Sequence, residues 1–314
     1  MSDFAFVFPG QGSQAVGMLD AYPDTEGVVS GTLEAASEVL GRDLADIIRN
    51  GPEEELNRTE NTQPAMLAAG VAAFALWGRR QGPNPAYLAG HSLGEYTALV
   101  AAGALDFHDA VALVADRARF MQEAVPAGQG KMAAILGLED ATIQQLCANQ
   151  HEGGVVRAAN FNSPGQVVIA GDVAAVEGVL KGAQASGAKR TVDLPVSIPS
   201  HCPLMQPAAE RLAERLAEVD IQKPALPVIN NVDVEAPTDP EAIRDALVRQ
   251  LANPVQWTQT IDRMRNSGVK RVIELGPGKV LCGLNKRIDR RMPCLSVGDA
   301  KGLDEALGAA GGEQ

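Results

Sequence analysis

Short, continuous apolar runs alternate along this chain with longer segments in which apolar residues recur at helical spacing. The first pattern is typical of buried strands and the second of helices that pack on them. We expect strands at 4–8, at the run that ends at Gly90, and at 226–230, 271–275 and 293–297, with helices at 32–40, 64–79 and 109–124 among the intervening segments. Strands that alternate with helices predict a parallel sheet covered on both faces.

A second pattern interrupts this alternation. Strand-like segments at 131–138, 154–159, 166–170 and 189–194 surround helical segments at 139–149 and 172–186. The order β-α-β-β-α-β is that of the ferredoxin-like unit. We therefore predict a large α/β catalytic domain from residues 1–125 and 199–307, an inserted ferredoxin-like domain at 126–198, and a flexible Gly-rich tail at 308–314. A cleft where two domains meet is a preferred place for ligands.

The most informative local motif follows the strand that ends at Gly90. The sequence Gly90-His-Ser-Leu-Gly94 passes directly into an Ala-rich helical run. A G-x-S-x-G turn between a strand and a helix is the nucleophile elbow, in which residues without a Cβ permit a sharp turn. The helix that follows directs its N–H groups and the positive end of its dipole toward the ligand. This context predicts that Ser92 is a nucleophile, with an ordinary structural turn as the alternative.

A nucleophilic serine needs a base, and the chain contains four histidines. His91 lies on the unfavourable side of the turn, where packing or a hydrogen bond near the cleft is the expected role. His108 begins a helix and His151 lies in a polar turn of the inserted domain. His201 remains, in a proline-flanked loop where the chain returns to the large domain. Serine and histidine need only be close in space, so elimination favours His201 as the base over a structural role.

An arginine occupies a core-facing position in the helix expected at 109–124. Apolar residues surround Arg117 on its stripe, whereas Arg119 falls on a polar stripe with Asp116 and Glu123 and can pair with them. A buried guanidinium is costly unless it meets a negative charge. Two explanations stay open at this point: a buried acidic side chain, or the carboxylate of a substrate held by a bidentate pair.

Composition restricts the class of protein. The chain has 314 residues, 46% of them hydrophobic, and a formal net charge of −12, which argues against non-specific nucleic-acid binding. No apolar run is long enough to span a membrane, and no signal peptide is visible. The four cysteines are scattered, so we expect free thiols in a reducing cytoplasm, with neither a disulfide nor a metal site.

These residues together resemble one known family. The chain is similar over nearly its whole length to the malonyl-CoA:acyl carrier protein transacylases of bacterial fatty acid synthesis. The segments that carry the resemblance are 6–14, 61–65, 90–95, 117–121, 160–166, 200–201, 250–257 and 274–278. Such a set of motifs in order is far more specific than any one of them.

The resemblance implies a role for each matching position. Ser92 would be the residue that is acylated and His201 its base. Gln11 would lie by the oxyanion hole, whose backbone donors would come from Gln11 and Leu93. Gln250 would place a carbonyl oxygen against the second ring nitrogen of His201, as an aspartate does in other triads.

The resemblance also implies an α/β-hydrolase-like fold for the large domain, a substrate and partners. Arg117 would bind the carboxylate of a malonyl group carried by malonyl-CoA, and the acceptor would be the phosphopantetheine thiol of an acyl carrier protein. Leu93 resembles malonyl-using members of the family, although preference over methylmalonyl stays open. Acyl carrier proteins are acidic, so a local basic patch is needed, and 286–291 and 189–190 are candidates. We expect a cytoplasmic monomer that needs no cofactor.

Two other classes of protein share part of this pattern. A serine hydrolase such as an esterase or thioesterase shares the elbow, but its histidine normally comes late in the chain, after an acidic residue, and no histidine follows His201 here. A dinucleotide-binding oxidoreductase is suggested formally by Gly10-x-Gly12-x-x-Ala15. The second strand that this class requires is replaced by the helical pattern at 32–40.

Overall fold

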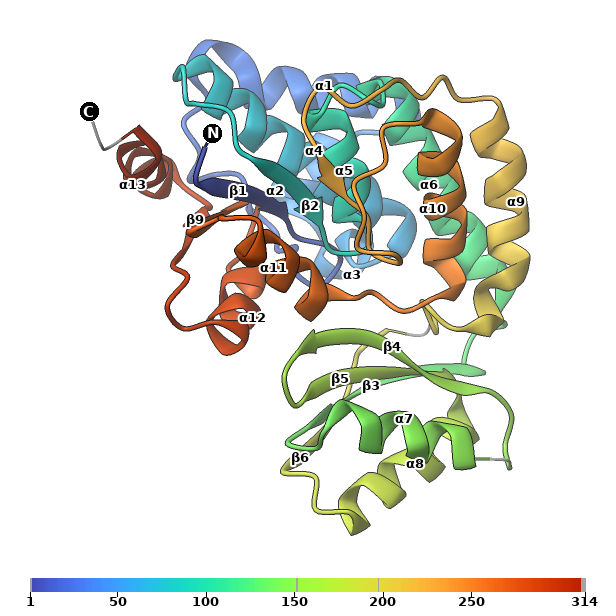
Figure 1. The fold of residues 1–314 in the computed structure, drawn as a ribbon. Coiled ribbons are helices and arrows are strands. Elements are labelled where there is room, and N and C mark those ends of the chain that lie inside the picture. The colour runs from blue at the N-terminus through green and yellow to red at the C-terminus, as the bar shows by residue number, and fades with distance from the viewer. Residues whose placement is uncertain (1, 151, 197, 312–314) are drawn as a thin grey trace.

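The computed structural model describes residues 2–150, 152–196 and 198–311. Its larger part is built on a five-stranded sheet in which all neighbouring strands are parallel. The strand order is β7 (Val228–Ile229), β2 (Tyr87–Gly90), β1 (Phe4–Phe8), β8 (Arg271–Leu275) and β9 (Cys294–Val297). This arrangement confirms the parallel α/β sheet that the sequence predicts (Figure 1).

The side chains of the central strand β1 alternate between two hydrophobic cores. Phe4, Phe6 and Phe8 belong to the larger core, and Ala5 and Val7 belong to the smaller one on the opposite face. This period of two is what a strand covered on both faces requires. The helices of the larger core are α1 (Val28–Leu40), α2 (Leu44–Asn50), α3 (Glu53–Leu56), α4 (Thr59–Arg79), α5 (Gly94–Ala101), α6 (Phe107–Ala124), α9 (Gln206–Ala217), α10 (Pro240–Ala252) and α13 (Ala300–Gly311), and those of the smaller core are α11 (Trp257–Asn266) and α12 (Val280–Ile288).

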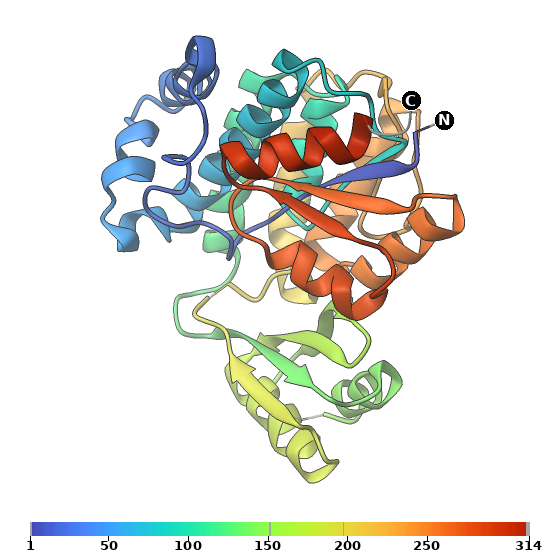
Figure 2. The same ribbon diagram turned by 90° about the vertical axis from the view of Figure 1, so that its left-hand side faces the viewer.

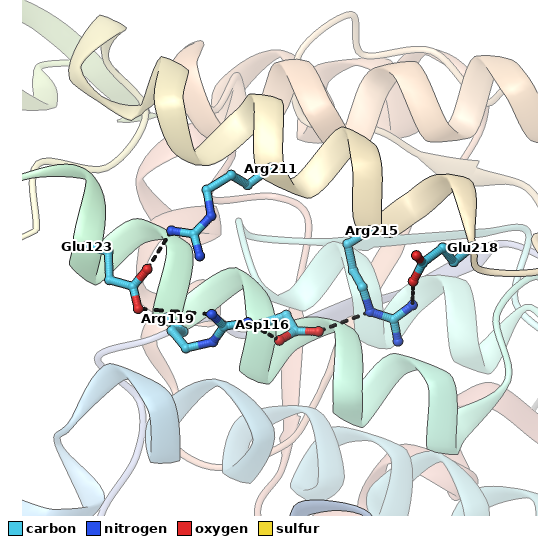
Figure 3. A network of polar contacts seen from close by, with 6 residues as sticks. All are labelled: Asp116, Arg119, Glu123, Arg211, Arg215 and Glu218. Atoms are coloured by element: carbon cyan, nitrogen blue, oxygen red, sulfur yellow. Dashed lines mark hydrogen bonds and ion pairs between the residues drawn. The ribbon is translucent and has the colours of Figure 1, made fainter.

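Helix α6 carries surface ion pairs on its outer side and a buried arginine on its inner side. Asp106 caps it by accepting hydrogen bonds from the N–H groups of the first turn. On its outer side, Arg119 pairs with Asp116 at 2.7 Å and with Glu123 at 4.0 Å, which confirms the expected partners. Figure 3 shows how these carboxylates also reach arginines of α9, with Arg215 Nε 3.0 Å from Asp116. Arg117 lies on the inner side and is 1% exposed.

The inserted part forms a second, antiparallel sheet of order β4 (Val156–Ser163), β5 (Gln166–Asp172), β3 (Gly130–Leu136) and β6 (Arg190–Asp193). Helices α7 (Asp140–Asn149) and α8 (Val173–Ala185) cover the face that points away from the large sheet (Figures 1 and 2). The connectivity is that of the predicted ferredoxin-like unit. The domain boundaries at 126–198 stay a prediction, and all the elements of this sheet lie within them.

The second expected strand of the small sheet is longer than predicted. A strand was expected at 154–159, but β4 continues to Ser163. Three of the four added residues are polar, yet they are buried, since Asn160 bridges to Val255 of the large domain and Asn162 faces the cleft. Contacts with a second domain, which hydrophobic alternation does not reveal, therefore extend the strand.

The expectation about the C-terminal tail also needs correction. The tail expected to be flexible at 308–314 is helical through Gly311 as the end of α13, whose Leu303 and Ala306 are buried, and 312–314 lie outside the described residues. The formal dinucleotide motif at 10–15 lies in a loop that is followed by no α-helix before residue 28, whereas the dinucleotide fingerprint opens directly into a helix. None of the helices in the described part of the chain combines the length and apolar character needed to cross a bilayer.

Candidate active site

Ser92 lies on a sharp turn between β2 and α5, as the sequence motif predicts. Its φ angle is 53°, a left-handed conformation that is unfavourable for a residue with a Cβ and is found mainly at functional sites. Glycine is required on both sides of it. A Cβ on Gly90 would overlap the backbone of Gly94, and a Cβ on Gly94 would overlap the carbonyl oxygen of Phe8. The elbow is thus packed directly against β1.

Asn231, which follows β7, holds the elbow in this conformation. Its Oδ1 accepts a 2.7 Å hydrogen bond from the backbone N–H of Ser92, and its Nδ2 donates at 2.7 Å to the carbonyl oxygen of Gly90. One side chain therefore fixes the backbone on both sides of the turn. Sequence reasoning did not identify Asn231, because nothing near it in the chain indicates contact with residue 92.

The structure brings His201 to Ser92. Nε2 of His201 lies 2.8 Å from Ser92 Oγ, and Nδ1 lies 2.7 Å from the backbone carbonyl oxygen of Gln250. A carbonyl oxygen can only accept, so Nδ1 carries the proton and Nε2 is left to accept the serine proton. Burial, followed by the positive charge of Arg117, lowers the pKa of His201 to about 3. The imidazole is therefore neutral at neutral pH, with Nε2 free to accept a proton.

Arg117 points its guanidinium at the same hydroxyl. Nη2 lies 3.3 Å from Ser92 Oγ and 3.1 Å from Oε1 of Gln250, and Nη1 donates to Oε1 of Gln63 at 2.6 Å. The ring of Tyr96 lies 5.3 Å from Cζ of the guanidinium, within range of a cation–π contact. Burial lowers the pKa of Arg117, but a guanidinium stays protonated in proteins.

The charge of Arg117 has no direct counter-ion among the described residues, because its hydrogen-bond acceptors are two neutral amides and the serine hydroxyl. Its Nε is also buried without an acceptor. Of the two explanations left open by the sequence, the structure therefore excludes an acidic side chain in contact with it. A buried cation of this kind is suited to a ligand that brings its own negative charge.

The remaining predicted residues border one cavity of about 450 Å³. The backbone N–H groups of Gln11 and Leu93 are without a protein acceptor in the described part of the chain, so they can donate to a ligand oxygen. The loop that carries Gln11 touches the elbow at Gly10, where a Cβ would overlap the carbonyl oxygen of His91. The wall opposite comes from the small domain and includes Met132, Asn160, Asn162, Val168 and Leu194.

His91 joins the two domains beside this cavity. Its Nε2 lies 2.8 Å from Oδ1 of Asn162 on β4, and its ring packs 5.5 Å from that of Trp257. This is the packing and hydrogen-bonding role expected for it. His108 is exposed at the start of α6, and His151 lies outside the described residues.

One expectation about the cysteines was wrong. Cys147 and Cys202 are free and buried, but Cys282 and Cys294 form a disulfide across a Cα–Cα distance of 5.1 Å. The pairing arises because α12 folds back onto β9, which the spacing in the sequence does not reveal. Glu274 lies close to both sulfurs, and its two oxygens accept from the N–H groups at the start of α12. With the sulfurs bonded and the carboxylate occupied, this group is not arranged to hold a metal.

Comparison with known proteins agrees with the geometry. The family model described as "Acyl transferase domain" matches residues 5–291, and the chain belongs to this family of acyltransferases. Its relatives include the malonyl CoA-acyl carrier protein transacylase of Escherichia coli, which is 54% identical over 98% of this chain and 99% of its own length.

Two solved structures extend this comparison. An acyl carrier protein S-malonyltransferase from Vibrio cholerae is 55% identical, with a TM-score of 0.95 over 97% of this chain and 100% of that one. A malonyl-transacylase in complex with its type II PKS acyl-carrier protein is 51% identical, with a TM-score of 0.96 over 98% of this chain and 100% of that one.

Proposed function

We propose that this acyltransferase moves a malonyl group from malonyl-CoA to the phosphopantetheine thiol of an acyl carrier protein, through a malonyl ester of Ser92. The observation that carries the proposal is the 3.3 Å separation between Arg117 Nη2 and Ser92 Oγ. A malonyl group has a single carbon between its thioester carbonyl and its carboxylate. A carbonyl placed at Ser92 therefore puts the carboxylate within reach of the guanidinium, where a bidentate pair can form.

In the first half-reaction, Ser92 Oγ attacks the thioester carbonyl carbon while Nε2 of His201 takes the hydroxyl proton. The N–H groups of Gln11 and Leu93 donate to the oxyanion that forms. Removing one such donor in other enzymes costs about 3 kcal/mol of transition-state stabilisation. When the carbon–sulfur bond breaks, His201 returns the proton to the CoA sulfur, and the malonyl group stays on Ser92 as an ester.

In the second half-reaction, the phosphopantetheine thiol gives its proton to His201 and its sulfur attacks the ester carbonyl. The bond to Ser92 Oγ breaks, and His201 gives the proton to that oxygen. Throughout the cycle the backbone carbonyl of Gln250 holds the Nδ1–H of His201, which fixes the ring and favours the imidazolium that forms transiently. Neither half-reaction involves a net oxidation or reduction, so the steps balance without a redox cofactor.

The selectivity for an acid-bearing acyl group follows from the burial of Arg117. An acetyl group in the same place would leave the guanidinium without a counter-ion, and an unpaired buried charge costs several kcal/mol. A simple serine hydrolase has no use for such a charge, and the relatives named above are transferases rather than hydrolases. The hydrolase alternative is therefore not favoured. That the chain is monomeric and cytoplasmic also stays a proposal.

Intact-protein mass spectrometry after exposure to malonyl-CoA tests the proposal. We expect one malonyl adduct on the wild-type protein, none on Ser92→Ala, and loss of the adduct when an acyl carrier protein with its phosphopantetheine arm is added, with malonyl appearing on that partner. Release of free malonate at the same rate with and without the carrier protein would contradict transfer and would support hydrolysis as the activity.

A further inference from the structure

A buried carboxylate that the mechanism above does not use lies beneath the active site. Glu95 is the second residue of α5 and is 2% exposed, in a helix whose other early residues are small or apolar. Burial of a carboxylate is costly unless hydrogen bonds compensate for the lost water. Its Oε2 accepts two of them, from the backbone N–H of Asn231 at 2.9 Å and from Nε2 of Gln250 at 2.8 Å.

The bond to Gln250 decides which way round that side-chain amide lies. An ionised carboxylate can only accept, so the NH2 group of Gln250 must face Glu95 and its Oε1 must face away. Oε1 then meets Nη2 of Arg117 at 3.1 Å. A flipped amide would bring NH2 against the guanidinium, donor against donor. Glu95, together with the carbonyl oxygen of Ser92, which accepts from the same NH2 group at 3.0 Å, thereby sets the acceptor that orients Arg117.

Gln250 is also bonded to the base and to the nucleophile. Its backbone carbonyl oxygen accepts from Nδ1 of His201, and Nε2 of its side chain donates to the carbonyl oxygen of Ser92 at 3.0 Å. Displacement of Gln250 would therefore disturb His201 through its backbone, and Ser92 and Arg117 through its side chain.

The bond to Asn231 supports the elbow from below. The side chain of Asn231 bonds to the N–H of Ser92 and to the carbonyl oxygen of Gly90. The backbone N–H of Asn231 in turn donates to the carboxylate of Glu95, which fixes the position of Asn231. Because Ser92 has an unfavourable φ, its conformation persists only where the surroundings determine it firmly.

From these contacts we infer that Glu95 is a positioning residue for the acyl-transfer reaction, and that its carboxylate, acting through Gln250 and Asn231, aligns Arg117, His201 and Ser92 with one another. Glu95 touches none of the reacting atoms. Its influence on Arg117 is specific, so its loss should alter the choice between acyl groups as well as the rate. The inference rests on the proposed function for its substrates.

Charge adds to the alignment. Burial raises the pKa of Glu95 to about 7, so the group is only partly ionised at neutral pH; the donors of Gln250 and Asn231, and then Arg117, favour the ionised form, whereas Asp233 opposes it. In its ionised form the carboxylate is separated from Arg117 by one amide, so it balances part of the guanidinium charge without occupying the place of the substrate carboxylate.

The test compares Glu95→Gln and Glu95→Leu with the wild type in two assays. The first is the ratio of single-turnover loading rates for malonyl-CoA and acetyl-CoA. The second is the labelling rate of Ser92 by a fluorophosphonate, which needs no acyl-CoA. For Glu95→Leu we expect labelling to fall about tenfold to a hundredfold, the scale of a lost hydrogen bond to a charged group, and the malonyl-to-acetyl ratio to fall as well. Glu95→Gln should be intermediate, because an amide accepts the bonds but no longer fixes the orientation of Gln250.

Glu274→Gln is the matched control. Glu274 is equally buried and also bonds to backbone N–H groups, but it is not linked to Ser92, His201 or Arg117. We expect its labelling rate and its ratio to stay at wild-type values even if its melting temperature falls.

A purely structural role for Glu95 would lower the melting temperature and the folded fraction, with an unchanged ratio per folded molecule, and would overturn the inference. If Glu95→Leu does not fold, Glu95→Gln decides: wild-type labelling and ratio in that variant would overturn the inference too. Failure of the wild type itself to load malonyl would instead count against the proposed function, and the labelling assay would still report on Glu95.

Discussion

Oε1 of Gln63 accepts a 2.6 Å hydrogen bond from Nη1 of Arg117, so an uncharged amide orients the guanidinium on the side away from Gln250. The two amide acceptors of the guanidinium, Gln63 and Gln250, are therefore neutral, and the positive charge of Arg117 stays available to a ligand. A carboxylate in place of either amide would orient the guanidinium equally well. It would also neutralise Arg117, which is the role proposed for the carboxylate of the substrate.

Gln63→Glu should for this reason abolish malonyl selectivity. An ion pair at position 63 neutralises Arg117 and adds a negative charge that repels the malonyl carboxylate. We expect malonyl loading to fall by about a hundredfold or more, the scale of breaking a buried charge pair, while acetyl loading changes little or rises. Single-turnover loading followed by mass spectrometry measures both rates.

The neutral variant Gln63→Met separates charge from shape. It removes the acceptor without adding a charge, so malonyl loading should fall less than in Gln63→Glu and acetyl loading should not gain. Equal effects of Met and Glu at position 63 would show that the neutrality of the amide is irrelevant.

Arg117→Ala should reduce malonyl loading and make acetyl loading relatively better, because the buried charge that penalises a neutral acyl group is then gone. The same substitution at Arg119, two residues along α6, is the control. Arg119 pairs on the outer surface with Asp116 and Glu123 (Figure 3), and exposed pairs contribute little. A preference for malonyl that survives in Arg117→Ala would show that another group selects the substrate.

The depressed pKa of His201 predicts a shift of the pH profile. Burial is the larger cause and the charge of Arg117 the second. Arg117→Gln removes the second cause, so the pKa of His201 should rise from about 3 toward its ordinary value. The imidazole must be neutral to accept the serine proton, so the acid-side decline in fluorophosphonate labelling should move to higher pH in this variant. A decline that stays in place or moves to lower pH would contradict the assigned cause.

The residues of the site that could be predicted are those marked by a local sequence pattern or by the elimination of other candidates. The elbow around Ser92 is a motif within one short segment, and Arg117 stands out because it interrupts an apolar helix face. His201 was reached because few histidines exist, and the role of Gln250 toward it came only from resemblance to a family. The geometry now agrees with each of these placements.

What could not be predicted depends on contacts between distant segments. Gln63 lies in a segment that carries the family resemblance, but nothing in it indicates a bond to Arg117. Asn231 and Glu95 meet only because β7 and β2 are neighbours in the sheet. The single available signal was Glu95 itself, a charged residue at the start of an apolar helix. The disulfide between Cys282 and Cys294 was missed for the same reason, since the return of α12 to β9 is a property of the fold.

The approach of an acidic carrier protein to a chain of net charge −12 requires a local positive surface. Helix α12 offers one beside the cavity: Val280, which is 47% exposed, borders the cavity, and exposed Lys286 and Arg287 follow on the same helix. Nη1 of Arg287 donates to Oε1 of Gln166 at 3.1 Å, so this positive surface extends to the edge of the small domain. An exposed apolar residue next to cations suits an acidic partner with an apolar contact of its own.

Reversal of these charges in Lys286→Glu/Arg287→Glu should raise the KM for the carrier protein by about tenfold at low salt, an effect that salt screens, and should leave malonyl loading from CoA nearly unchanged. Lys301→Glu on α13, which packs on the opposite face of the sheet from α12 (Figure 1), makes the same kind of charge change away from the cavity and should alter neither constant. Steady-state kinetics with the carrier protein varied at two salt concentrations distinguishes the two surfaces. An unchanged KM in the double variant, or an equal rise with Lys301→Glu, would show that α12 is not where the carrier protein docks.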